Sequence, residues 1–167
     1  PARGRRPRRA QPAAEADAQG RMVKARWVEG LNAPKGLRSF GGKLYAADID
    51  ELVEIDIAGA VVTRRMKAPG ALMLNDVAVD GLGNVYVSDT LGSSIFRFSP
   101  QGEVFVFAQG PELESPNGLC FFGGKLYVAA WGLAKPDWST AKPGRLLAVD
   151  VKTKAVGVVG APGGNLD

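Results

Sequence analysis

The stretch Leu74-Asn75-Asp76-Val77, followed after a short turn by Val85-Tyr86-Val87-Ser88-Asp89, decides the fold because it recurs twice more in this chain. The other two copies are Pro34-Lys35-Gly36-Leu37 with Leu44-Tyr45-Ala46-Ala47-Asp48, and Pro116-Asn117-Gly118-Leu119 with Leu126-Tyr127-Val128-Ala129-Ala130. The three tyrosines are separated by two equal steps of 41 residues. A repeat of this length is typical of one blade of a β-propeller.

Each repeat also has the composition of a four-stranded unit. It starts at a turn, crosses a polar hinge such as Gly41-Gly42-Lys43, and continues into apolar, β-branched and aromatic runs. Further apolar runs follow at residues 52–57, 60–63, 94–98, 103–107 and 146–151. Four short strands per unit predict propeller blades near residues 34–73, 74–115 and 116–164.

The same spacing extends to both ends of the chain. It places residues 17–28 where the outermost hairpin of a preceding blade would lie, and Asn165-Leu166-Asp167 where another blade would open. We therefore predict an all-β chain whose residues 17–167 form a partial β-propeller, with about three to four four-stranded blades out of an expected six. Because such a chain would expose strand edges, we expect self-association through them as one kind of contact.

The positive charge is concentrated at the N-terminus. Five arginines before residue 10 supply part of the 21 positive charges, so that residues 10–167 carry 16 positive against 17 negative charges. We predict that residues 1–16, rich in Arg, Pro and Ala, are a disordered tail, either solvated or a gene-model artefact. The alternative is an electrostatic anchor for an anionic partner. The nearly neutral body predicts no nucleic-acid site.

Missing residue types narrow the chemistry further. The chain has no histidine, which excludes a Ser-His-Asp triad and imidazole metal sites. Its one cysteine, Cys120, lies in the apolar run Leu119-Cys120-Phe121-Phe122, and we predict that it is a small buried hydrophobic residue. No run approaches the roughly 18 apolar residues of a membrane span. The compartment stays open.

Oxygen ligands remain as candidates for a site. Aligning the turns that open each unit places Lys35, Asn75, Asn117 and Asp167 at equivalent positions. Equivalent positions of a propeller converge on its axis, so two amide side chains and one carboxylate would meet at one mouth of the central channel. Hard cations such as calcium prefer oxygens of this kind. In the alternative interpretation, the asparagines serve turn geometry and Lys35 lies at the rim.

Other polar and aromatic residues of the repeat favour structural roles. Asp48 and Asp89 follow their tyrosines by three residues, and we expect them to accept hydrogen bonds from turn amides. Trp131 and Trp138 flank an insertion at residues 133–140. They either pack on a neighbouring blade or belong to a lid beside the channel.

Four motifs together resemble the gluconolactonase/regucalcin family of six-bladed propellers, whose relatives are the strictosidine-synthase-like and paraoxonase-like propellers. The motifs span residues 75–80, 83–90, 115–119 and 164–167. The resemblance implies a central divalent cation, commonly calcium, that activates a lactone or ester for hydrolysis. It assigns Asn75, Asn117 and Asp167 as metal ligands and Asp167 as a possible catalytic base.

One ligand of that family has no counterpart in this chain. The resemblance implies a glutamate from the first blade, and the Arg/Pro-rich segment stands where it would be. We therefore expect a part of a metal-dependent lactone or ester hydrolase that is inactive alone. The competing interpretations are a non-catalytic propeller module that binds a ligand or protein, and a truncated product without activity.

Overall fold

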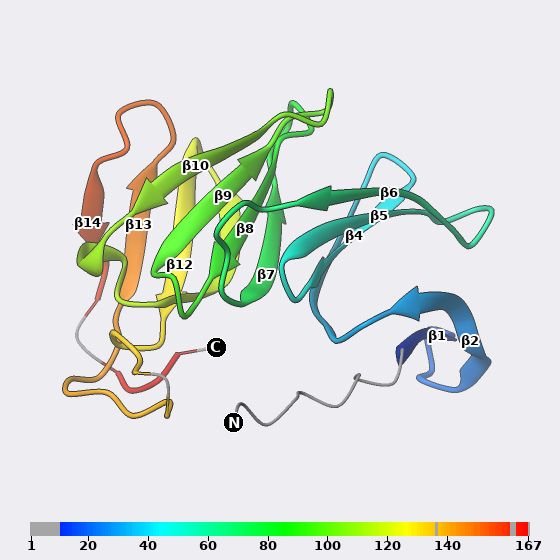
Figure 1. Cartoon of the computed structure of the whole chain (residues 1–167), viewed down its shortest axis with the longest axis horizontal. Helices are drawn as coiled ribbons and strands as arrows, with labels where there is room; N and C mark the ends of the chain where they lie inside the picture. The colour runs from blue at the N-terminus through cyan, green and yellow to red at the C-terminus, as the bar shows by residue number, and fades with distance from the viewer. Residues whose placement is uncertain (1–10, 136, 161–162, 167) are drawn as a thin grey trace, which may run out of the picture.

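The structure, a computed structural model, describes residues 11–135, 137–160 and 163–166, which form antiparallel sheets joined in chain order (Figure 1). A two-stranded sheet comes first, and three four-stranded sheets follow it. The elements are β1 (Gln11–Ala16), β2 (Met22–Leu31), β3 (Pro34–Phe40), β4 (Lys43–Asp48), β5 (Glu51–Asp56), β6 (Val61–Lys67), β7 (Leu74–Val79), β8 (Val85–Asp89), β9 (Ser94–Phe98), β10 (Val104–Gln109), the single 3₁₀ turn η1 (Pro111–Leu113), β11 (Pro116–Phe122), β12 (Lys125–Ala130), β13 (Leu146–Asp150) and β14 (Val156–Val158).

Each four-stranded sheet is a meander whose strands pair in sequence order. The first hairpin of two of these sheets turns at a Gly-Gly pair with positive φ at both residues, 56° and 77° at Gly41 and Gly42 and 56° and 76° at Gly123 and Gly124. Glycine adopts two such angles in succession without strain, and a Gly-Gly pair is one of the favoured two-residue hairpin turns. The hinges and strand runs predicted from the repeat are confirmed.

The core lies between neighbouring sheets. Three clusters of buried side chains each join one sheet to the next, from β1–β2 through to β11–β14. The first strands of the four-stranded sheets adjoin one another, since β7 contacts both β3 and β11. Figure 1 shows the sheets side by side in chain order, from β1 and β2 at one end to β13 and β14 at the other. This is the arrangement of consecutive blades of a β-propeller.

The N-terminal hairpin differs from its prediction. Residues 11–16 form strand β1, which pairs with β2 around a turn at residues 17–21, whereas the sequence predicted a disordered tail over 1–16 and a hairpin within 17–28. Val28 and Leu31 of β2 pack on the β3–β6 sheet, and this contact gives the hairpin an apolar anchor. Residues 1–10 lie outside the described residues.

The prediction that Cys120 is buried is wrong, because its side chain is exposed. Leu119 points into the core between the last two sheets, and residues alternate faces along a strand, so Cys120 points the other way. Phe122 lies on the same exposed face. Among the described residues, no helix is long and apolar enough to cross a membrane.

Candidate functional site

Asn75 and Asn117, which are 42 residues apart, meet side chain to side chain. The Asn75 amide nitrogen donates to Asn117 Oδ1 and, at 3.0 Å, to Thr90 Oγ1. The Asn117 amide nitrogen donates to the Leu166 carbonyl at 3.1 Å, and the Asn117 residue is only 2% exposed. We call Asn75 and Asn117 the amide pair. The structure thus brings together two of the three predicted site residues; Asp167 lies outside the described residues.

A bulge lies at the start of each inner strand, where these side chains meet. The strand register shifts between Leu74 and Val77 in β7, and between Pro116 and Gly118 in β11. The same shift occurs at the start of β3, which carries Lys35. A bulge inserts a residue and changes the direction in which its side chain points. Lys35 itself is exposed, which agrees with a rim position.

Two buried carboxylates hold the segments that lead into the inner strands. Asp89 accepts hydrogen bonds from the backbone amides of Leu72 and Met73 at 3.0 and 2.7 Å, just before β7. Asp48 makes the equivalent bonds to residues 32 and 33, just before β3. The prediction that Asp48 and Asp89 satisfy turn amides is therefore confirmed. Through these bonds, Asp89 fixes the entry of the strand that carries Asn75.

Polar groups around the amide pair form a connected network that sequence reasoning missed. The Asp76 amide donates to Ser88 Oγ at 2.9 Å, and the Ser88 hydroxyl donates to the Asn117 carbonyl at 2.6 Å. The Thr90 hydroxyl donates to the Pro116 carbonyl at 2.9 Å, and Ser88 and Thr90 are fully buried. Such a network orients the amide pair before any ligand arrives.

Asp76 and Gly36 bring the neighbouring inner strands close together. The Asp76 carboxylate accepts a hydrogen bond from the Leu119 amide at 2.8 Å, which ties β7 to β11. On the other side, a Cβ built on Gly36 would lie 2.7 Å from the Asn75 carbonyl oxygen. Because glycine has no side chain, β3 can approach β7 at this point.

Arg38 is a second feature that the sequence analysis did not single out. Its Nε donates to the Val77 carbonyl at 3.0 Å and its Nη2 to the Leu119 carbonyl at 3.5 Å. The side chain therefore reaches from β3 past β7 to β11 and places a permanent positive charge beside the inner strands. Its signal in sequence is only that Arg38 stands where the other repeats have Ala78 and Cys120.

The ligand chemistry of the amide pair fits a hard cation in part. Amide oxygens are suitable ligands for calcium, but they carry no net charge. Among the described residues, no group of three or more His, Cys, Asp or Glu side chains could hold a metal ion. The amide pair would thus contribute neutral oxygens, and any carboxylate of such a site would have to come from another residue.

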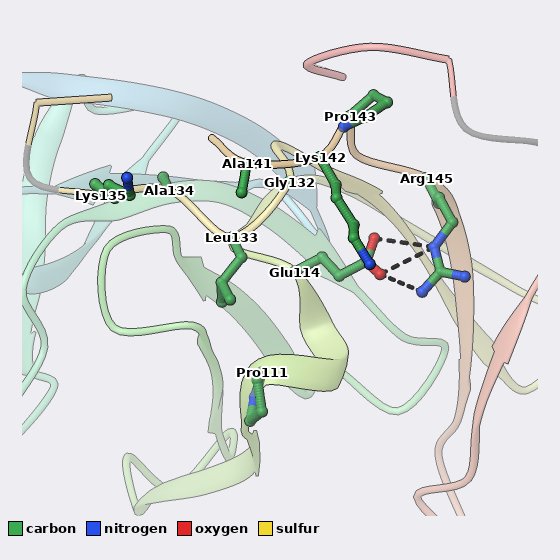
Figure 2. Close-up of a pocket in the computed structure, with 10 residues that line it drawn as sticks. All are labelled: Pro111, Glu114, Gly132, Leu133, Ala134, Lys135, Ala141, Lys142, Pro143 and Arg145. Atoms are coloured by element: carbon green, nitrogen blue, oxygen red, sulfur yellow. Dashed lines mark hydrogen bonds and ion pairs between the residues drawn. The ribbon is translucent and has the colours of Figure 1, made fainter. Parts of the chain in front are cut away.

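A cavity of about 650 Å³ lies beside the β12–β13 loop, residues 131–145 (Figure 2). Its lining comprises Pro111, Glu114, Gly132, Leu133, Ala134, Lys135, Ala141, Lys142, Pro143 and Arg145, and includes neither member of the amide pair. The Trp131 and Trp138 rings of this loop pack edge to face, with their centroids 5.6 Å apart. Trp131 Nε1 also donates a hydrogen bond to the Trp138 carbonyl. The two indoles thus brace the loop against itself.

No protein-family profile and no curated protein matches this sequence. Solved structures do match. Virginiamycin B lyase from Staphylococcus aureus superposes with a TM-score of 0.66 at 12% identity, over 88% of this chain and 47% of the lyase. A chain of the nidogen/laminin complex gives a TM-score of 0.64 at 18% identity, over 84% of this chain and 52% of that chain. The computationally designed Ika4 protein gives a TM-score of 0.60 at 12% identity, over 83% of this chain and 79% of Ika4.

This chain therefore spans about half the length of the lyase and nidogen/laminin chains. At such low identity the likeness concerns the fold, and the matched structures are β-propellers. The resemblance to the gluconolactonase/regucalcin family stays a prediction. The chain has the fold of part of a β-propeller.

Proposed function

We propose that the amide pair is the neutral part of a divalent-cation site, probed best with calcium, in a propeller hydrolase that acts on lactones or esters. The observation that carries the proposal is the meeting of Asn75 and Asn117, far apart in sequence, at equivalent bulges of consecutive blades. Turn geometry alone explains an asparagine at each bulge. It gives no reason for the two side chains to contact each other in a buried polar network.

The roles of the residues follow from the gluconolactonase-type resemblance and the chemistry of their side chains. Asn75 and Asn117 would offer amide oxygens, and Asp167 would offer the carboxylate ligand and base. The Leu166 carbonyl accepts a hydrogen bond from the Asn117 side-chain amide, and Leu166 directly precedes Asp167 in the sequence. When bound, the cation would polarise the carbonyl group of the lactone or ester. Ser88 and Thr90 would keep the asparagines oriented through their hydrogen bonds.

Charge limits what this chain would do alone. Calcium sites with few carboxylates bind in the range of about 10⁻⁴–10⁻³ M. We therefore propose weak calcium binding and no turnover for this chain. Propellers host both enzymes and binding modules, and the matched structures include a lyase and a chain of the nidogen/laminin complex. Hydrolysis thus needs a test separate from cation binding.

Calcium titration followed by thermal unfolding tests the site. If the dissociation constant is about 1 mM, then about 10 mM calcium should stabilise the folded chain by about 1.4 kcal/mol, which corresponds to a rise of roughly 3–5 °C in Tm. Asn117→Asp adds a carboxylate and should bind calcium about tenfold more tightly. Asn117→Ala should lose the response.

Gln101→Glu is the matched control, because it adds the same charge at an exposed turn between β9 and β10. It should respond to calcium as the unaltered chain does. An equal response in Asn117→Asp and Gln101→Glu, or none in any variant, would contradict the proposal. A lactone-hydrolysis assay at fixed calcium then separates binding from turnover, and measurable hydrolysis by this chain would overturn the expectation that it is inactive alone.

A further inference from the structure

The cavity beside the β12–β13 loop has the dimensions of a small-molecule site. Its volume of about 650 Å³ falls within the roughly 300–1,000 Å³ of pockets that hold drug-sized ligands. Half of its lining is apolar, with Pro111, Leu133 and Pro143 among those residues. Figure 2 shows the Leu133 side chain pointing toward Pro111, although Leu133 is 52% exposed.

Hydrogen bonds hold the two walls of the cavity together. The Gly132 amide donates to the Glu114 carbonyl at 2.8 Å, and the Ala134 amide donates to Ser115 Oγ at 2.8 Å. At the base of the loop, a Cβ on Gly132 would lie 2.5 Å from the Lys142 carbonyl oxygen and 2.7 Å from the Gly144 nitrogen. The backbone thus closes tightly on itself there. A cavity with fixed walls loses little entropy when a ligand binds.

Strained backbone surrounds the same cavity. Glu114 and Ser115 are consecutive residues with φ of 52° and 57°, and Leu133 has a φ of 32°. Non-glycine residues adopt such angles at a cost, and they persist where neighbouring contacts impose them. Clusters of this kind favour functional sites. Here the strained residues belong to both walls, one segment after η1 and the other after β12.

The charges of the lining leave a positive surplus. Lys135, Lys142 and Arg145 supply three cations against the single carboxylate of Glu114, a net charge of +2. Arg145 binds that carboxylate through Nε at 2.9 and 3.1 Å and also through Nη2, and this hydrogen bonding raises the pKa of Arg145. In Figure 2 the dashed lines from this carboxylate run to Arg145. The Glu114 carboxylate therefore pairs with Arg145, and the lining carries two further cations, Lys135 and Lys142.

We propose that this cavity binds a small carboxylate with an apolar body, whose carboxylate lies near Lys142 and whose body lies against Leu133 and Pro111. The apolar lining favours the body, and the surplus positive charge favours an anion over a neutral molecule. The site is independent of the amide pair, because neither asparagine lines it. Evidence for or against this cavity therefore does not depend on whether the amide pair binds a cation.

A fluorescent anion tests the proposal in the full chain. The probe is anilinonaphthalene sulfonate, and its neutral counterpart is phenylnaphthylamine, which has a similar aromatic body without the anionic group. We expect one-to-one binding of the anion, at least fivefold weaker binding of the neutral probe, and displacement of the anion by octanoate and not by octanol. A charge-assisted contact of about 1 kcal/mol corresponds to the fivefold difference.

Three variants locate the binding. Lys142→Met keeps most of the apolar part of the side chain but removes its charge, and it should weaken binding of the anionic probe about fivefold without changing binding of the neutral probe. Ala141→Trp occupies part of the cavity and should weaken the binding of both probes. Lys152→Met, in the exposed turn between β13 and β14, should change neither. If Lys142→Met and Ala141→Trp bind the anionic probe as the unaltered chain does, the probe sits on another apolar surface and the proposal is wrong. Displacement by octanol as strong as that by octanoate would also overturn it.

Discussion

Replacing Gly36 by alanine should push the β3–β6 and β7–β10 sheets apart at the amide pair. The added Cβ would lie 2.5 Å from the Asp76 Cα and 2.7 Å from the Asn75 carbonyl oxygen. Both are backbone atoms, so no side-chain rotation relieves the contact. Since non-bonded carbon atoms rest at about 3.5–4.0 Å, the strands must separate by about 1 Å.

The expected cost follows from this displacement. Added methyl groups in well-packed interiors cost about 1–3 kcal/mol, and the contacts at Gly36 are tighter than an ordinary packed methyl would make. We therefore expect the free energy of unfolding to fall by about 2–3 kcal/mol. For a chain of this size, that corresponds to a decrease in Tm of roughly 5–10 °C.

Thermal unfolding followed by circular dichroism measures the effect, and Gly81→Ala is the matched control. A Cβ on Gly81 would have no atom within 4 Å, and its φ lies outside the left-handed region. Its Tm should stay within about 2 °C of the unaltered chain, because surface substitutions usually cost less than about 0.5 kcal/mol. An unchanged Tm for Gly36→Ala would refute the close approach of β3 and β7. Equal losses in both variants would show that glycine content, and not this contact, sets the effect.

Two further predictions concern buried polar groups. Asp89→Asn places an NH₂ group against a backbone amide such as that of Met73, so the free energy of unfolding measured with urea should fall by about 2–3 kcal/mol. The exposed control Asp137→Asn should change this free energy little. Equal losses in the two variants would refute this role of Asp89. Burial, and next the Asp80 carboxylate, raise the pKa of Tyr86 from 10.0 to about 12. The folded state therefore keeps the Tyr86 proton between about pH 10 and 12, so stability should fall as pH rises through this window, by about 2 kcal/mol more than in Tyr86→Phe. Tyrosinate absorbance checks this, and ionisation of Tyr86 near pH 10 would contradict it.

The repeat was sufficient to predict the sheets because its signals are local. Gly41-Gly42 and Gly123-Gly124 fix hairpins by their own backbone preferences, and the apolar runs beside them pair with the nearest strand. Cys120 shows the limit of this reasoning. An apolar run identifies a strand, but which of its faces is covered depends on whether another sheet packs there. Leu119 meets a neighbouring sheet and Cys120 does not, among the described residues.

The amide pair was predictable for a different reason. Residues at equivalent positions of a repeat occupy equivalent positions around the axis, provided that the local backbone also repeats. The shared bulges of β3, β7 and β11, together with the matching bonds of Asp48 and Asp89, satisfy that condition. The alignment of turns therefore located Asn75 and Asn117 without any knowledge of the tilt between the sheets.

Arg38 and the cavity could not be found by this route, because both depend on a break in the repeat. Arg38 replaces a small residue of the other units, and its reach to Leu119 depends on how closely β3, β7 and β11 adjoin. The cavity exists because residues 131–145 are longer than the equivalent hairpins, and because Glu114 meets Arg145 only once η1 and β13 are in place. Repetition thus determines where the inner strands of the blades converge, and departures from repetition create Arg38's position and the cavity. Variants at residues that depart from the repeat, such as Arg38 and those of the cavity, should therefore best distinguish the function of this chain from that of other propellers.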